Sequence, residues 1–206
     1  MIWNSSLFMA IKAVIFDFAG VLTTSGCWPA VAKKLSAKLG IEKELILKHL
    51  YAKEDAIVRG EQSTRDFWEQ NLKEIGIPFD AFEEEFAHWY ELNAETLKLA
   101  RELKNNYRIV VFSDNFDAAT PFIRKEPVLA NLFEEMFFSN EMHLIKAEEA
   151  SFKHVLKEIA LKAEECVFID DKETNFTNPK KIGLHTILFK DVKQVRKELE
   201  GLGIGF

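Results

Sequence analysis

The chain has 206 residues, enough for one domain with an inserted segment and for a sizeable hydrophobic core. Hydrophobic residues make up 48% of the chain and charged residues 29%, which excludes a disordered or fibrous protein. The net charge is −6, from 27 basic and 33 acidic residues, without a dense Lys/Arg cluster. We therefore expect no nucleic-acid partner, because binding to a phosphate backbone needs clustered positive charge.

Cysteine usage and the N-terminal segment bear on the compartment. The two cysteines, Cys27 and Cys166, are too few for a disulfide framework, and neither has metal-ligand spacing. Residues 1–10 lack a basic region and a long apolar region, Met9 is a possible alternative start, and no run of about 18 apolar residues occurs. These features predict a reducing, cytoplasmic setting, with neither export nor a membrane partner.

Five short apolar runs, each 3 to 4 residues long, predict the strands of a parallel sheet. Most of them end in polar or acidic residues, and helical patterns separate the later ones, which is typical of crossover connections between parallel strands. The runs are 13–16, 109–112, 136–138, 167–169 and 186–189. Amphipathic helices are expected over 95–104 and 150–160, because their apolar residues recur every three to four positions.

The interval between the first two runs is too long for a single crossover helix, which needs only about a dozen residues. Four helices are predicted inside it. The first runs from Pro29 to Gly40, and the second covers 42–58. The third follows Ser63 and Thr64 and stops at Gly76. The fourth begins at Asp80 and contains the aromatic residues Phe82, Phe86, Trp89 and Tyr90. The many phenylalanines, 18 in all, are expected to pack in cores.

These elements predict an α/β protein with a three-layer, Rossmann-like parallel-sheet core and an inserted helical-bundle cap. We assign residues 10–23 and 92–206 to the core domain and residues 24–91 to the cap domain.

Polar residues follow the ends of the predicted strands, where ligands bind in open parallel sheets. Asp17 follows the first run, and Ser113 with Asp114 and Asn115 follows the second. Lys146 lies in the segment after the third, and the pair Asp170 and Asp171 follows the fourth. Each residue alone has an ordinary structural explanation as a turn former, helix cap or surface charge. Together they predict a site at one edge of the sheet.

Adjacent carboxylates after an apolar strand repel each other unless a cation or hydrogen-bond donors neutralise them. With Asp17, the pair Asp170 and Asp171 supplies hard oxygen ligands of the kind that Mg²⁺ prefers, together with waters and substrate phosphate. The sequence therefore predicts a Mg²⁺ cofactor.

Four segments, in order, resemble the motifs of the haloacid dehalogenase-like (HAD) superfamily and cover nearly the whole chain. FDFAGVL at 16–22 resembles the first motif and FSDN at 112–115 the second. The segment from Ser139 through Lys146 to Phe152 matches the third in spacing, with Ala147 where the family often has proline, and FIDDKETN at 168–175 resembles the fourth. The insertion after the first motif resembles the C1 helical cap of subfamily IA. Within it, Arg59-Gly60-Glu61 before Phe67-Trp68 is similar to the group of small sugar-phosphate phosphatases and the N-terminal phosphatase of soluble epoxide hydrolase.

The resemblance implies a Mg²⁺-dependent hydrolase of a small phosphorylated metabolite. Asp17 is then the nucleophile that forms an aspartyl-phosphate, and Ser113 and Lys146 are catalytic residues that hold the phosphate oxygens. The metal ligands implied are Asp17, the backbone carbonyl of Ala19, Asp170 and Asp171. Asp114 and Asn115 are candidate substrate-binding residues beside Ser113 and Lys146, or caps of the following helix.

Ala19 departs from the family pattern, because phosphatases of the family usually have a second aspartate at this position as general acid and base. An alanine methyl cannot transfer a proton, so slow turnover is expected unless another group substitutes, and general acid–base catalysis is typically worth about 10² to 10⁴ in rate. The alternatives are a phosphonatase-like hydrolase with a cap lysine such as Lys53, a dehalogenase-like hydrolase, which the retained acidic pair disfavours, or a phosphate-binding scaffold.

Cap residues are candidates for the missing acid. His49, Glu54 and Asp55 lie in the inserted segment and would reach the site if the cap closes over it. Asn175 is expected to order the loop that carries the acidic pair. We expect a monomer or a homodimer.

Overall fold

The computed structural model describes residues 10–52 and 54–206. The N-terminal predictions, including Met9, and the candidate lysine Lys53 fall outside the described residues. Within those residues, no helix has both the length and the apolar character needed to cross a membrane.

A five-stranded parallel sheet lies at the centre of the fold, in the order β3-β2-β1-β4-β5. The register places Ala13 of the central strand beside Arg108 on one side and Cys166 on the other. All five predicted runs are confirmed as strands, with ends shifted by one residue or less. They are β1 (Ala13–Phe16), β2 (Arg108–Ser113), β3 (Glu135–Phe138), β4 (Cys166–Asp170) and β5 (His185–Leu188).

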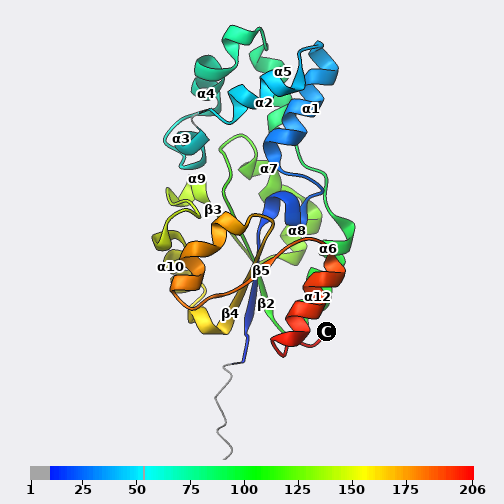
Figure 1. The fold of residues 1–206 in the computed structure, drawn as a ribbon, viewed down its shortest axis with the longest axis vertical. Coiled ribbons are helices and arrows are strands. Elements are labelled where there is room, and N and C mark those ends of the chain that lie inside the picture. The colour runs from blue at the N-terminus through cyan, green and yellow to red at the C-terminus, as the bar shows by residue number, and fades with distance from the viewer. Residues whose placement is uncertain (1–9, 53) are drawn as a thin grey trace, which may run out of the picture.

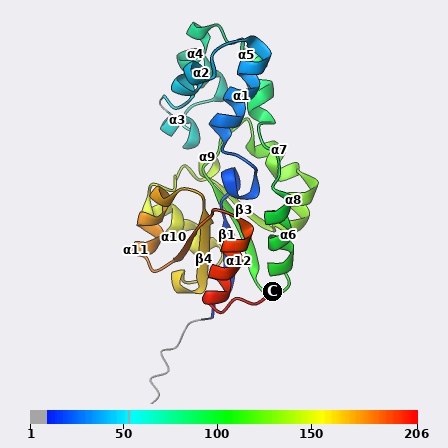
Figure 2. The same ribbon diagram turned by 45° about the vertical axis from the view of Figure 1, so that its right-hand side comes forward.

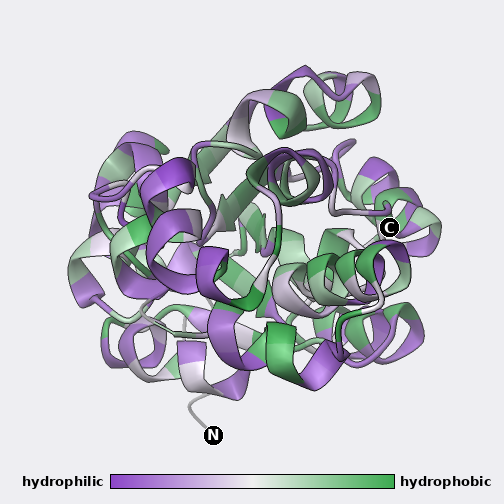
Figure 3. Ribbon diagram, turned by 90° about the horizontal axis from the view of Figure 1, so that it is seen from above, coloured by the Kyte–Doolittle hydropathy of each residue, from purple (hydrophilic) through white to green (hydrophobic). Residues whose placement is uncertain are grey.

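Helices cover both faces of the sheet and give the predicted three layers (Figures 1 and 2). Alternate strand residues point to opposite faces: Val14 and Phe16 join one hydrophobic cluster, and Ala13 and Ile15 join the other. The first face is covered by α6 (Ala94–Leu103), α7 (Thr120–Lys125), α8 (Pro127–Leu132) and α12 (Val192–Gly201), and the second by α10 (Glu149–Glu158) and α11 (Thr177–Lys181). Seen from above, the outward turns of several helices are hydrophilic (Figure 3).

A group of helices stands beyond the carboxyl ends of the strands (Figure 1). It consists of α1 (Cys27–Leu39), α2 (Lys43–Leu50), α3 (Glu54–Val58), α4 (Thr64–Asn71) and α5 (Phe79–Ala87). Trp28 is stacked on Phe67 and Phe86, with ring centroids 5.5 and 5.3 Å apart. These phenylalanines are fully buried, as core packing predicts.

The chain passes between the helical group and the sheet at two adjacent points. Thr23 and Leu92 form an antiparallel bridge there, and the Asn93 N–H donates to the Leu22 carbonyl at 2.9 Å. The two passages lie at the proposed limits of the 24–91 segment, and the division into a core domain and a cap domain stays a prediction.

The prediction of one helix over 42–58 is wrong. The structure has two helices there, because α2 ends at Leu50 and α3 begins at Glu54. The break turns α3 toward the sheet, where the Val58 carbonyl accepts a hydrogen bond from Ser139 Oγ at 2.5 Å. The apolar spacing predicted helical residues correctly but gave no signal for this change of direction.

The fourth helix is also shorter than predicted, since α5 ends at Ala87 and leaves Trp89 and Tyr90 outside it. Both rings pack edge-on against Phe18, at centroid distances of 5.8 and 5.3 Å. Contact with Phe18, directly after the first strand, holds these aromatic residues in the returning segment.

Candidate active site

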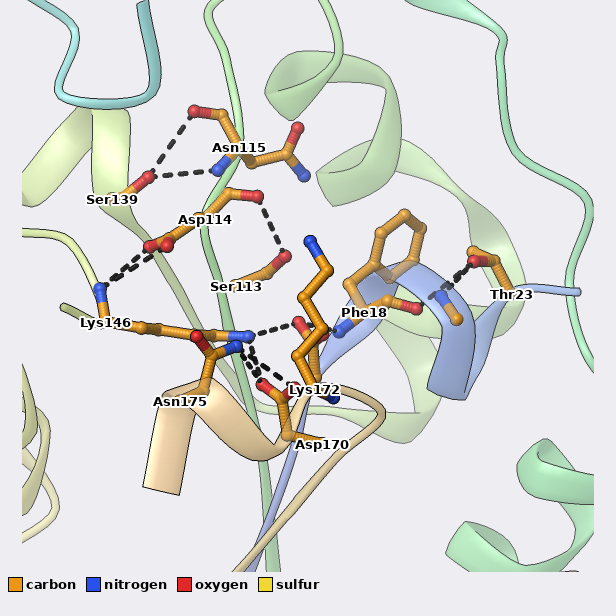
Figure 4. Close-up of polar contacts among 12 residues, drawn as sticks. Phe18, Thr23, Ser113, Asp114, Asn115, Ser139, Lys146, Asp170, Lys172 and Asn175 are labelled. Carbon is orange, nitrogen blue, oxygen red and sulfur yellow. Dashed lines mark hydrogen bonds and ion pairs between the residues drawn. The ribbon is translucent and has the colours of Figure 1, made fainter. Parts of the chain in front are cut away.

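The strand ends bring the predicted residues to one edge of the sheet (Figure 4). Asp17 follows β1, Ser113 and Asp170 are the last residues of β2 and β4, and Lys146 lies in the loop before α10. Strands β2 and β4 both pair with β1, so these side chains flank Asp17 from both sides.

A buried lysine lies between two carboxylates at the floor of the site. Lys146 Nζ is 2.6 Å from Asp17 Oδ1 and 2.7 Å from Asp170 Oδ2. The lysine is 2% exposed, Asp17 is 4% exposed and Asp170 is fully buried. Buried charges are tolerated where they are paired and hydrogen-bonded, and this ion triad meets that condition.

Burial and neighbouring charges shift the pKa values of the groups around Lys146. Burial, with a contribution from Asp170, raises the pKa of Asp17 to about 7 against the lowering effect of Lys146. Burial alone would lower the pKa of Lys146, but Asp17, Asp170 and Asp114 raise it above its usual value. The pKa of Asp171 is also raised, by burial and by Asp170. One ammonium does not fully compensate these carboxylates.

In the turn after Asp17, one position has a backbone conformation that only glycine fits. Gly20 has φ +82°, and a Cβ there would lie 2.3 Å from Asp171 Oδ2. Thr23 Oγ1 accepts a hydrogen bond from the Gly20 N–H at 2.9 Å, and Asp17 Oδ1 accepts one from the Phe18 N–H at 2.6 Å. The turn thus fixes the nucleophile candidate and brings backbone close to the acidic pair.

Asp170 is held in place by donors from its own loop. Asn175 Nδ2 donates to both carboxylate oxygens, at 3.0 and 2.9 Å, and the Lys172 N–H donates to Oδ1 at 2.8 Å. The predicted ordering role of Asn175 agrees with these contacts (Figure 4).

The cluster fits a divalent cation. One carboxylate oxygen from each of Asp17, Asp170 and Asp171 lies within 4.8 Å of the others. Asp171 Oδ1 is buried and has no hydrogen-bond partner within the described residues, which is costly for a carboxylate unless a cation neutralises it. Hard oxygen ligands of this kind match Mg²⁺.

Three polar residues at the end of β2 flank the lysine. Ser113 is 1% exposed and its hydroxyl makes one long contact, 3.2 Å, with the Asp114 carbonyl. Asp114 accepts from the backbone N–H of Lys146 at 3.1 Å and so positions that residue. Asn115 Oδ1 accepts from the Phe116 N–H at 3.0 Å, while its buried Nδ2 has no partner within the described residues.

A cavity of about 330 Å³ lies between the helical group and the sheet edge. Ala19, Asp114 and Asp171 line it from below, and Glu54 and Asp55 of α3 line it from above. His49 is not among its lining residues, since its Nδ1 contacts the Asn71 carbonyl at 2.7 Å. Two of the three cap candidates for the missing acid therefore reach the cavity.

Other lining residues had no specific sequence signal. Trp28 and Phe116 form aromatic wall, with ring centroids 4.9 Å apart, and Lys172 adds a cation. Cys27, also in the lining, is buried and its thiol pKa is raised well above the usual value. Trp28 directly precedes the predicted helix start at Pro29, and this position alone gives no indication that its side chain lines the cavity.

The fold and site define a Rossmann-like α/β protein with a carboxylate-rich site at the carboxyl edge of its sheet. The family model of haloacid dehalogenase-like hydrolases matches residues 11–176, and the chain belongs to this family.

Two fungal relatives are similar to the chain to different extents. A sesquiterpene phosphatase, astK, of Aspergillus oryzae is 29% identical over 197 residues, which are 93% of this chain and 96% of the relative. A drimenol cyclase, drtB, of Aspergillus calidoustus is 32% identical over 71 residues, which are 34% of this chain and only 13% of the cyclase.

Solved structures share the fold. A predicted HAD-like hydrolase from Porphyromonas gingivalis superposes with a TM-score of 0.75 at 21% identity, covering 95% of this chain and 99% of that one. A HAD-family enzyme from Bacteroides thetaiotaomicron, crystallised with magnesium and inorganic phosphate, has a TM-score of 0.71 at 20% identity, with 90% and 99% covered.

Proposed function

We propose that the protein hydrolyses small phosphomonoesters with Mg²⁺ and forms an aspartyl-phosphate on Asp17. The observation that carries this proposal is the cluster of Asp17, Asp170, Asp171 and Lys146, which reaches the cavity through Asp171. The full-length similarity to a phosphatase and the magnesium and phosphate of the Bacteroides structure support it.

Each residue of the site has its own role in the proposed reaction. An oxygen of Asp17 attacks phosphorus in line, and water then hydrolyses the aspartyl-phosphate, so one difficult displacement becomes two easier ones. The Ser113 hydroxyl and the Lys146 ammonium hold the phosphate oxygens, where transition-state charge is spread. Asp114 positions Lys146 through its backbone N–H, and the free Nδ2 of Asn115 is a further donor for substrate.

The metal ligands proposed are Asp17, the Ala19 carbonyl, Asp170 and Asp171. Mg²⁺ bound there supplies positive charge between an anionic nucleophile and an anionic substrate. Ala19 does not affect this ligand set, because a backbone carbonyl is available whatever the side chain.

The cavity also favours a substrate class. Asp55 and Asp114 place negative charge around the leaving-group side, with Lys172 as the one cation in the lining, while Trp28 and Phe116 supply apolar surface. Like charges brought together cost several kcal/mol, so anionic leaving groups are disfavoured. We propose an uncharged, largely apolar leaving alcohol, in keeping with the terpenoid substrate named for the Aspergillus oryzae phosphatase.

The first test is metal-dependent phosphate release from 4-nitrophenyl phosphate. We expect turnover with Mg²⁺ and a loss of at least about 10²-fold in excess chelator, restored by added Mg²⁺, because the ion supplies several kcal/mol of charge stabilisation. Turnover that is unaffected by chelator contradicts the proposal.

The alternatives give different outcomes in the same experiment. Halide release from a 2-haloacid without phosphate release favours a dehalogenase. Phosphate release from a phosphonate but from no phosphomonoester favours a phosphonatase. Phosphate binding without turnover of any of these compounds favours a scaffold.

Leaving-group charge gives a second prediction. Hexyl phosphate and 6-phosphohexanoate have the same length and differ by one carboxylate. We expect kcat/KM to be at least about 10-fold higher for hexyl phosphate, which corresponds to about 1.4 kcal/mol of repulsion. The ratio should fall as salt is added, because the charges are partly exposed. Equal kcat/KM values for the pair would show that the carboxylates do not select the substrate.

A further inference from the structure

The cavity lacks a proton-transfer group at the position where Ala19 lies. Ala19 lines the cavity two residues after Asp17, and its methyl group neither donates nor accepts a proton. The proposed reaction needs a proton for the leaving oxygen and later takes one from the attacking water. Another lining residue must serve both needs if turnover is efficient.

Most titratable residues of the cavity are unsuited to this role. Asp171 is a proposed metal ligand, and Asp114 is engaged with the Lys146 backbone N–H at 3.1 Å. Burial raises the pKa of Cys27, so its thiol does not act as a base. The Lys172 ammonium has no lone pair with which to take a proton from water, and a phenol such as that of Tyr51 is a much weaker acid than a carboxyl group.

Glu54 and Asp55 remain, and they differ in how firmly they are held. Asp55 is exposed, and within the described part of the chain its carboxylate has no hydrogen bond. Glu54 is partly buried and its Oε2 accepts a hydrogen bond from Trp28 Nε1.

Trp28 is itself immobilised by its neighbours. It is 5% exposed, and its ring is stacked on those of Phe67 and Phe86, nearly parallel to both, at interplanar angles of 7° and 9°. A rigid indole fixes one oxygen of Glu54 and leaves the other without a partner in the described residues. Helix α3, which begins at Glu54, lies on the side of the helical group that faces α9 (Ser139–Met142) and the sheet edge (Figures 1 and 2).

We propose that Glu54, oriented by Trp28, is the general acid and base of the reaction, in the role that Ala19 does not fill. The inference rests on the proposed phosphatase function. When Asp17 attacks phosphorus, the bond to the leaving oxygen breaks, and that oxygen takes the proton of the Glu54 carboxyl. The Glu54 carboxylate then takes a proton from water while the water oxygen attacks phosphorus, and the bond between phosphorus and Asp17 breaks. The products are an alcohol and phosphate, and both carboxyl groups return to their starting forms.

The test compares Glu54→Gln on two substrates whose leaving groups differ in their need for an acid. For hexyl phosphate, a poor leaving group, we expect kcat/KM to fall by about 10² to 10⁴. For 4-nitrophenyl phosphate, kcat/KM should change little, because the phenolate leaves without a proton. Its kcat should still fall, because water attack lacks its base, and acid quenching should trap more phosphorylated protein than in the parent. Glu44→Gln, an exposed carboxylate of α2 outside the cavity lining, is the matched control and should behave like the parent.

Two further variants separate catalysis from structure. Ala19→Asp should restore alkyl phosphate turnover in the Glu54→Gln background and should add much less to the parent. Trp28→Phe keeps the aromatic stack but removes the indole donor, so it should lower alkyl phosphate turnover in the parent and have no further effect in Glu54→Gln.

The outcomes distinguish this inference from the function on which it rests. Equal losses of kcat/KM on both substrates, or the expected pattern in Asp55→Asn instead of Glu54→Gln, overturn the assignment to Glu54. An active parent with an unchanged Glu54→Gln variant overturns the inference alone. A parent that is inactive on both substrates overturns the proposed function and the inference with it.

Discussion

Asp17→Asn should abolish phosphate release, with a loss of at least about 10³-fold in kcat, because removing a nucleophile leaves only the contributions of binding and orientation. The amide has nearly the same shape as the carboxylate but neither its charge nor its nucleophilic oxygen. The parent, quenched in acid during turnover, should retain phosphate in a hydroxylamine-sensitive acyl bond, and the variant should retain none.

The loss should not come from unfolding. Burial raises the pKa of Asp17 to about 7, so the folded state disfavours the charged form and loses stability as pH rises from the usual carboxyl pKa toward that value. A neutral amide removes this cost at pH 8, although it gives up the ion pair with Lys146. Urea denaturation in chelator should therefore place the variant close to the parent. Asp80→Asn, at an exposed residue of α5, is the control and should retain full activity. Substantial turnover by Asp17→Asn rules out the aspartyl-phosphate.

The sheet was predictable because its strands are buried on both faces. A strand covered by helices on both sides is a continuous apolar run, as 13–16 and 167–169 are, and such runs stand out from amphipathic helices. The residues at the sheet edge were predictable for the same reason. Asp17 comes directly after a strand, and Ser113 and Asp170 are the last residues of theirs, so finding the strands also finds these residues.

The helical segment was less predictable, because periodicity reports which residues face a core but not where a helix changes direction. The new direction of α3 brings the Val58 carbonyl to the hydroxyl of Ser139, which is distant in sequence. The early end of α5 depends on the aromatic packing of Trp89 and Tyr90 against Phe18. Neither contact has a local signal.

The site shows the same limit. Asp170 and Asp171 were evident as a pair, but the bond from Trp28 to Glu54 joins residues 26 positions apart. A Cβ at Gly20 would likewise lie only 2.3 Å from Asp171 Oδ2, and Asp171 follows a different strand. Sequence spacing predicted the carboxylates and the lysine at the sheet edge, and the packing of the helical group around Trp28 decides how Glu54 is held.

Lys146→Met should destabilise the protein by about 3–5 kcal/mol in chelator, because removing one partner of a buried ion pair leaves its counter-charges uncompensated. Here both Asp17 and Asp170 lose their nearest cation. Methionine fills most of the volume, so the cost is electrostatic more than steric. Urea denaturation with chelator measures the change, and added Mg²⁺ should recover part of it if the three carboxylates bind the ion.

Lys153 is a control that separates the effect of burial from the effect of ion-pair distance. Lys153 Nζ lies 2.6 Å from Glu149 Oε1, as close as Lys146 lies to Asp17, but its side chain is 63% exposed against 3%. Exposed pairs within one helix contribute little to stability, so Lys153→Met should cost much less than Lys146→Met. The double variant Lys146→Met/Asp17→Asn should regain stability over Lys146→Met, since one uncompensated carboxylate is gone. Equal losses of unfolding free energy in the two lysine variants would mean that the buried lysine does not balance the carboxylates. That result would contradict the electrostatic account of the site.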